Sequence, residues 1–141
     1  MITNKQLIES WNTYNISNIE AFKLDEIQYV LFADETGNIQ SALDSGCDGL
    51  VFPRIEDRIS AKNCISQCFF APRGKRGFNP FTRFNQYNLN KNKIKKKLLK
   101  IIMTETKKGM ENIEEIISVS GIDVIYFGIF DLSMEYSLKI T

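Results

Sequence analysis

Short apolar runs alternate with amphipathic segments along most of the chain. The apolar runs span five to seven residues and are rich in β-branched and aromatic side chains, which is typical of buried strands. They predict strands at 27–33, 49–53, 98–104 and 123–128. Outside these runs, apolar residues recur three or four positions apart, which is typical of one face of a helix. This spacing predicts helices at 4–14, 36–45, 57–68, 107–119 and from Asp131 onward.

Strands that alternate with helices pair in parallel through right-handed crossovers. The pattern gives about four βα units, whereas a complete (β/α)₈ barrel takes about 250 residues and rarely fewer than about 200. We therefore expect an α/β fold with a parallel sheet, either open or part of a TIM barrel and not a complete eight-stranded one. The pattern alone leaves a small doubly wound sheet as an alternative. We divide the chain into a helical segment over 1–26 and a βα domain over 27–141.

The stretch between the second and third predicted strands differs from the rest. Residues 71–92 are rich in proline, glycine and asparagine and show no helical or strand periodicity. Loops of this length inside a compact domain are usually functional or disordered. A basic run follows, composed of Lys91, Lys93, Lys95, Lys96, Lys97 and Lys100. We interpret the run as a solvated face before the third strand, with phosphate or nucleic-acid contact as the alternative.

The composition is that of an ordinary soluble domain, with 141 residues, 43% hydrophobic residues and a net charge of +1. So small a net charge gives no reason to expect nucleic acid or an acidic membrane as a partner. No apolar run approaches the roughly 20 residues of a membrane span, and the N-terminal residues lack the apolar core of a signal peptide. We therefore expect a cytoplasmic protein.

Cysteine and histidine usage restricts the chemistry. The three cysteines, Cys47, Cys64 and Cys68, form no dense framework, and we interpret them as small buried hydrophobes. The chain contains no histidine. Its absence excludes histidine triads, histidine metal ligands and the commonest general base.

Four motifs occur in an order and spacing that resemble one enzyme family. They are Ala42-Leu43-Asp44-Ser45-Gly46-Cys47-Asp48-Gly49-Leu50-Val51-Phe52-Pro53, Ala71-Pro72-Arg73-Gly74-Lys75-Arg76-Gly77, Thr104-Glu105-Thr106 with Gly109 and Asn112, and Gly121-Ile122-Asp123 followed by Gly128-Ile129-Phe130-Asp131-Leu132-Ser133. Together they are similar to the pattern of the HpcH/HpaI aldolase/citrate lyase family. The resemblance covers about residues 27–138.

The resemblance implies a metal-dependent carbon–carbon lyase. Glu105 and Asp131 match the family's ligands for a divalent cation, Mg²⁺ or Mn²⁺, and each follows a predicted strand, where barrel active sites lie. The metal would hold a 2-oxo acid such as pyruvate and stabilise an enolate. Backbone N–H groups of Gly128 and of the turn at Ser133 would bind the substrate carboxylate. Arg76 would contact the substrate or a subunit interface.

Each of these residues also has a simpler interpretation. Glu105 could be a solvated or capping residue at a strand end, and Asp131 could cap the following helix. Arg76 could be a solvated charge in the loop. In isolation, none of the three would indicate a metal or substrate site, so their assignment depends on the family pattern.

Three departures from the family pattern weaken the case for catalysis. The family's first two strands, which carry a Glu-His pair, have no counterpart in residues 1–26. Leu31 stands where the family's Val-Arg-Val strand has its arginine, so the charge and the forked geometry that bind a carboxylate are lost. The chain ends at Thr141, where two further βα units would follow.

Two functions follow from these observations. The first is a divergent lyase of the aldolase type, acting on a 2-oxo acid through a metal-bound enolate. The alternative is a non-catalytic half-barrel that serves as a binding or assembly protein. Because a half-barrel exposes an apolar sheet edge, we also expect a homo-oligomer, with the loop at 71–92 near the contact.

Overall fold

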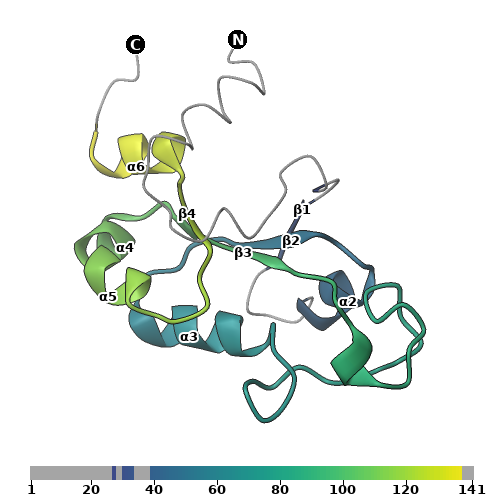
Figure 1. The fold of residues 1–141 in the computed structure, drawn as a ribbon. Coiled ribbons are helices and arrows are strands. Elements are labelled where there is room, and N and C mark those ends of the chain that lie inside the picture. The colour runs from purple at the N-terminus through teal and green to yellow at the C-terminus, as the bar shows by residue number, and fades with distance from the viewer. Residues whose placement is uncertain (1–26, 28–29, 34–38, 138–141) are drawn as a thin grey trace.

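The computed structural model describes residues 27, 30–33 and 39–137 (Figure 1). The helix predicted at 4–14 and the segment 1–26 lie outside this part of the chain, as do residues 138–141 at the end of the last predicted helix. Within the described ranges, no helix is both long enough and apolar enough to cross a membrane.

All four predicted strands are present and form one parallel sheet. They are β1 (Val30–Phe32), β2 (Gly49–Phe52), β3 (Leu99–Thr104) and β4 (Val124–Phe127). The strands lie in the order β1-β2-β3-β4, so each strand pairs with the next along the chain. This order is that of consecutive βα units in a barrel, whereas a doubly wound sheet reverses its strand order. The prediction of a partial barrel is confirmed.

Five α-helices connect or follow the strands in the described residues. They are α2 (Ile39–Asp44), α3 (Arg58–Ser66), α4 (Lys107–Glu111), α5 (Ile113–Ile117) and α6 (Ile129–Glu135), with a short 3₁₀ turn, η3 (Lys91–Lys93). Asp57 caps α3 as predicted, because its Oδ1 accepts a hydrogen bond from the Ser60 N–H at 2.8 Å. Gly46 has a φ of +87° just beyond α2, as expected of a glycine that ends a helix.

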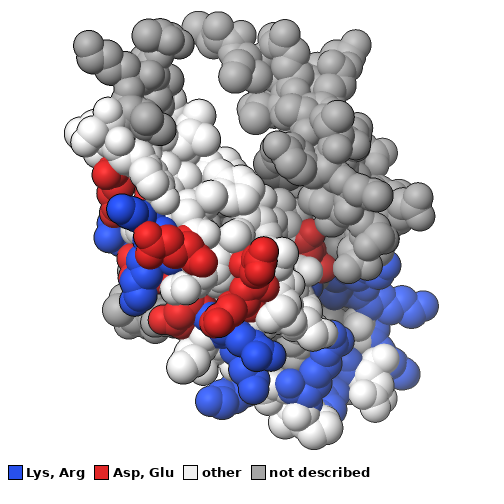
Figure 2. Space-filling view, turned by 90° about the vertical axis from the view of Figure 1, so that its left-hand side faces the viewer, with Lys and Arg blue, Asp and Glu red and all other residues white. Residues whose placement is uncertain are grey.

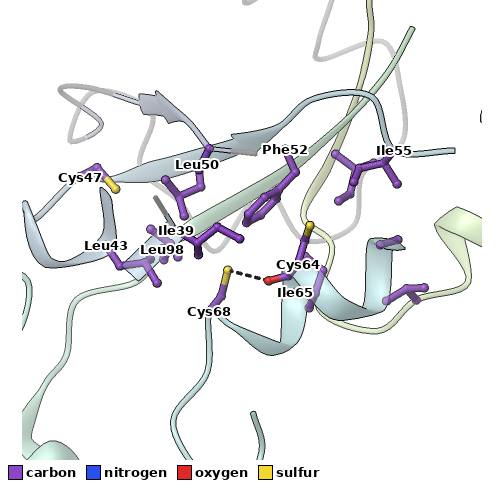
Figure 3. Close-up of a cluster of buried hydrophobic side chains, with 14 of the residues drawn as sticks. Ile39, Leu43, Cys47, Leu50, Phe52, Ile55, Cys64, Ile65, Cys68 and Leu98 are labelled. Atoms are coloured by element: carbon purple, nitrogen blue, oxygen red, sulfur yellow. Dashed lines mark hydrogen bonds between the residues drawn. The ribbon is translucent and has the colours of Figure 1, made fainter. Parts of the chain in front are cut away.

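The sheet has two different faces. Alternate residues of β3 point to opposite sides, so Ile102 packs against the helices while Ile101 faces away from them. The helix side holds the main core, in which Leu50 and Phe52 of β2 pack against Cys64 and the rest of α3 (Figure 3). On the other side, the described residues form a smaller buried cluster of Val51, Leu99, Ile101 and Val124. In Figure 1, α3 and α5 lie below the sheet and α6 lies above it.

Two predicted helices differ from the observed ones. The segment 107–119 forms two short helices, α4 and α5, which meet at Asn112. The backbone there has a φ of −100° and a ψ of 13°, and the Asn112 side chain donates to the Glu56 carbonyl oxygen at 2.9 Å. This bond ties the helix to the connection between β2 and α3, and it explains the break. Helix α6 begins at Ile129 with Gly128 as its N-cap, so the alternative of Asp131 as the cap is wrong.

The loop at 71–92 is packed, although it contains little regular structure. Phe84 and Asn85 are buried, and the Asn85 side chain donates to the Asn79 carbonyl oxygen at 2.6 Å. A side chain at Gly46 would meet Arg83 Cβ at 2.9 Å, so the loop lies directly against the end of α2. The loop therefore lies at the end of the sheet where the strands begin.

Candidate metal centre

Glu105 lies where the carboxyl ends of β2, β3 and β4 converge. It directly follows the last residue of β3. Its side chain points to the same side of the sheet as Ile101 and Met103, opposite the main core. Only 7% of its surface is exposed. An ionised carboxylate is rarely so buried unless it has partners.

The backbone of Arg54 supplies one such partner. Its N–H donates to Oε1 of Glu105 over 3.1 Å. Arg54 has a φ of +53°, an uncommon conformation for a residue with a side chain, and it follows β2 by two positions. Strained backbone of this kind is concentrated at functional sites. The end of β2 is therefore shaped to direct a donor toward Glu105.

Gly128, at the end of β4, approaches Glu105 from the other side. A Cβ built on Gly128 would lie 2.5 Å from the Cβ of Glu105 and 3.0 Å from its Oε2. The Gly128 N–H donates to the Thr104 carbonyl oxygen at 3.0 Å and so extends the pairing of β3 with β4. Only a glycine lets this backbone pass so close to the carboxylate.

Asp131 brings a second carboxylate to the same place. It sits in the first turn of α6 and is exposed, and its carboxyl group lies close enough to that of Glu105 to change its pKa. Burial, and then hydrogen bonding to Asp131 and its negative charge, raise the pKa of Glu105 above its ordinary value. The structure thus brings together the two residues that the sequence predicts as metal ligands.

This pair has the donor chemistry of a site for a hard divalent cation. Two carboxylates offer oxygen ligands, and a cation between them would offset the repulsion that raises the pKa of Glu105. The described residues contain no cluster of three or more side chains of the metal-binding types histidine, cysteine, aspartate and glutamate. A cation here would therefore depend on Glu105, Asp131 and further oxygen ligands such as water or substrate, as Mg²⁺ sites commonly do.

The structure places the two predicted substrate-binding residues, Gly128 and Ser133, in settings that differ from the expected ones. The Gly128 N–H bonds to Thr104, as described above. Ser133 lies inside α6 and not in a turn, and its hydroxyl donates to the Phe130 carbonyl oxygen at 2.6 Å. Substrate binding by these two residues stays a prediction.

Arg76 lies at the other end of the sheet. Its guanidinium contacts Asp44, the last residue of α2, at 3.3 Å and stacks on the ring of Phe84 at 4.0 Å. Only 5% of the residue is exposed, and its Nε has no hydrogen-bond partner. The interpretation of Arg76 as a solvated loop charge is therefore wrong. The structure does not bring it together with Glu105 and Asp131.

The structure changes which residue of β1 is expected to face the site. Leu31 packs against the helix-side core, so an arginine there would point away from Glu105. Phe32, one residue later, lies with Val30 on the side of the sheet opposite the main core, and it is 64% exposed. Phe32 is thus the residue of β1 that faces the site. The role of the Arg54 N–H was not predicted either, because a positive φ at a residue other than glycine leaves no signal in the sequence.

A known protein family matches most of the chain. The family model for HpcH/HpaI aldolase/citrate lyase matches residues 31–140. The chain belongs to the HpcH/HpaI aldolase/citrate lyase family. The match begins within β1 and includes Glu105, Asp131 and the whole described sheet from Leu31 onward.

Curated relatives in this family are aldolases by name. A hydroxypyruvate/pyruvate aldolase of Rhizorhabdus wittichii is 30% identical over 103 residues, which cover 72% of this chain and 41% of the relative. A 4-hydroxy-4-methyl-2-oxoglutarate aldolase of Chaetomium globosum is 33% identical over 110 residues, covering 72% of this chain and 40% of the relative. The chain thus spans about two fifths of the length of these relatives.

Solved structures of the family share the fold. An HpcH/HpaI aldolase from Desulfitobacterium hafniense superimposes with a TM-score of 0.69 at 17% identity, covering 98% of this chain and 52% of that one. A family protein from Burkholderia cenocepacia gives a TM-score of 0.65 at 24% identity, covering 72% and 43%. Because these neighbours are TIM barrels, the four βα units described here correspond to part of such a barrel.

Proposed function

We propose that this chain carries the metal-binding part of a carbon–carbon lyase of the aldolase type that acts on a 2-oxo acid such as pyruvate. The observation that carries the proposal is the buried Glu105 carboxylate beside Asp131, at the carboxyl ends of parallel strands. The relatives named above act on compounds of this class, as their names state. Glu105 and Asp131 would hold Mg²⁺ or Mn²⁺.

The chain's own residues would prepare this site in three ways. The Arg54 N–H holds one oxygen of Glu105 in place. The carboxylate therefore has less conformational freedom to lose when it binds a cation. Gly128 lets the backbone after β4 lie directly beside the Glu105 side chain without a clash. Asp131 is exposed, so that a ligand from solvent can approach it. A divalent ion held there would supply Lewis-acid polarisation of the substrate's keto oxygen.

A second candidate function is a binding or assembly protein without catalysis. Two observations favour it. The chain has no histidine to move a proton, and Phe32 gives the site side of β1 an aromatic ring that cannot bind a carboxylate. This candidate retains the metal pair, so metal binding alone does not separate the two functions.

An assay of aldol cleavage separates them. The protein is incubated with a 4-hydroxy-2-oxo acid and Mn²⁺, and the release of pyruvate is followed with lactate dehydrogenase and NADH. The lyase proposal predicts release that Glu105→Ala abolishes and that Glu114→Gln, an exposed carboxylate on α5, leaves unchanged. Metal binding without any pyruvate release would support the second candidate and contradict the first.

We also propose that the chain forms a homo-oligomer. Large apolar side chains on α6 are exposed, including 73% of Phe130 and 80% of Met134. Surfaces of this kind are commonly covered by another protein chain. Light scattering coupled to size-exclusion chromatography should give a mass at least twice the 16.2 kDa of one chain, and a monomer would contradict the proposal.

A further inference from the structure

The side chain of Arg54 is not explained by its backbone contact with Glu105. The Arg54 N–H donates to Glu105 Oε1 over 3.1 Å, and any residue except proline could supply that donor. The φ of +53° at this position is one that glycine and asparagine adopt more readily than arginine. The fold therefore accounts for the backbone of this residue, but it does not account for an arginine.

The chain on either side of Arg54 is held firmly. Phe52, the last residue of β2, is fully buried, and Ile55 is 2% exposed. The Ile55 N–H donates to the Met103 carbonyl oxygen at 3.2 Å, which ties this connection to β3 two residues before Glu105. Arg54 itself is exposed. Its side chain is thus carried into solvent from a fixed point beside the metal centre.

The guanidinium group of Arg54 is close to the metal centre and available to an anion. Burial and Asp131 raise the pKa of Glu105, and the positive charge of Arg54 acts in the opposite direction, so the guanidinium lies near that carboxylate. Within the part of the chain that the structure describes, it nevertheless forms no ion pair, either with Glu105 or with another carboxylate.

The carboxylates that follow Arg54 in the sequence have other partners. Glu56 pairs with Lys108 at 3.3 Å, and Asp57 caps α3. Figure 2, which views the molecule from the side of α4 and α5, likewise shows acidic and basic side chains next to one another on this face. Neither of these two neighbours neutralises Arg54, so its charge can serve a ligand.

We propose that Arg54 binds a second carboxylate of the substrate, at the end that extends away from the metal centre. This inference rests on the proposed function. The carboxylate next to the oxo group would be held at Glu105 and Asp131 through the cation, whereas Arg54 lies beside this pair and is exposed. An arginine binds a carboxylate through two parallel charge-assisted hydrogen bonds. The preferred substrates would therefore be 2-oxo acids that carry a carboxylate at both ends.

Calorimetric titration of the Mn²⁺-loaded protein with 2-oxoglutarate and with 2-oxopentanoate tests this proposal, at about 0.15 M salt. The two acids have carbon chains of the same length, and only 2-oxoglutarate carries a second carboxylate. The wild type should bind 2-oxoglutarate at least about tenfold more tightly, as expected of hydrogen bonds between charged groups. Equal binding of the two acids would overturn this inference alone, whereas binding of neither would overturn the proposed function with it.

Arg54→Gln should lose the preference for 2-oxoglutarate, because it removes the charge and keeps the backbone N–H that binds Glu105. Its affinity for Mn²⁺ should equal or exceed that of the wild type, since a positive charge near the cation is removed. Arg54→Lys should retain part of the preference, because it keeps the charge without the forked geometry. Weaker Mn²⁺ binding by Arg54→Gln would mean that the side chain supports the metal centre itself, and it would overturn the inference.

The matched control is Arg83→Gln. Arg83 is an exposed arginine of the loop against Gly46, at the opposite end of the sheet, and its substitution changes the net charge equally. This variant should keep the preference to within about twofold, in line with the small effects of exposed charges. An equal loss of preference in Arg83→Gln and Arg54→Gln would overturn the inference. So would a folded Arg54→Gln that discriminates between the two acids as the wild type does.

Discussion

Glu105 combines features that an ordinary strand-end glutamate lacks. It is nearly buried, it accepts the Arg54 N–H, and it lies beside a second carboxylate. Gly128 passes so close that no side chain fits between them. The sequence predicts Glu105 and Asp131 through the family motif. It could not predict the Arg54 donor or the side of β1 that faces the site, because both depend on backbone geometry and strand register.

The close approach of Gly128 predicts a large effect of a single methyl group. Gly128→Ala should lower the free energy of unfolding by about 1–3 kcal/mol, since its Cβ would collide with Cβ of Glu105. Gly77→Ala is the matched control, because its Cβ would meet nothing closer than the Gln40 side chain at 3.7 Å. Urea unfolding of both variants measures the difference. Equal stability of the two variants would contradict this packing.

The raised pKa of Glu105 predicts a pH effect in metal-free protein. The folded state binds this proton more tightly than the unfolded chain, because burial and Asp131 raise the pKa. The free energy of unfolding should therefore fall as the pH rises from the ordinary range of a glutamate, about 4.3, through the higher folded value. Urea unfolding at a series of pH values should show this fall in wild type and in Glu114→Gln. In Glu105→Gln the fall should be smaller. If this variant keeps the pH profile of the wild type, Glu105 is not the group responsible.

At the scale of elements, apolar periodicity predicts all four strands and their parallel pairing. It works because apolar side chains on the helix side of the strands, such as Leu50, Phe52 and Ile102, pack into the main core. The helices were predicted less well. The break at Asn112 depends on a bond to Glu56, which is 56 residues away in the sequence, so no local pattern reveals it. The packed loop at 71–92 contains few apolar residues, and its buried asparagine is held by hydrogen bonds.

The cap of α3 gives a prediction at this scale. Asp57→Ala removes the acceptor for the Ser60 N–H and should lower the free energy of unfolding by about 1 kcal/mol. Asp57→Asn keeps an oxygen at the same position and should lose much less. Thermal or urea unfolding compares the two variants. If asparagine and alanine destabilise the protein equally, the cap bond is not the cause.

On the scale of the whole molecule, the two ends of the sheet differ in chemistry. The carboxyl ends of the strands carry the pair of carboxylates, and the amino ends border a pocket whose lining includes several lysine and arginine side chains. The two sides of the sheet differ as well: helices α3 and α5 cover one side, and on the other the described residues form a smaller apolar cluster. The site therefore faces the side that would form the interior of a complete barrel.

Binding of Mn²⁺ to metal-free protein tests the account most directly. Calorimetric titration should show one site in the wild type, and the same affinity in Glu114→Gln. Glu105→Gln should bind at least about tenfold more weakly, because it replaces a charged ligand by a neutral one. Circular dichroism would establish that this variant is folded. A wild-type protein that binds no Mn²⁺, or a folded Glu105→Gln that binds it equally well, would contradict the assignment of Glu105 and Asp131 as a metal centre.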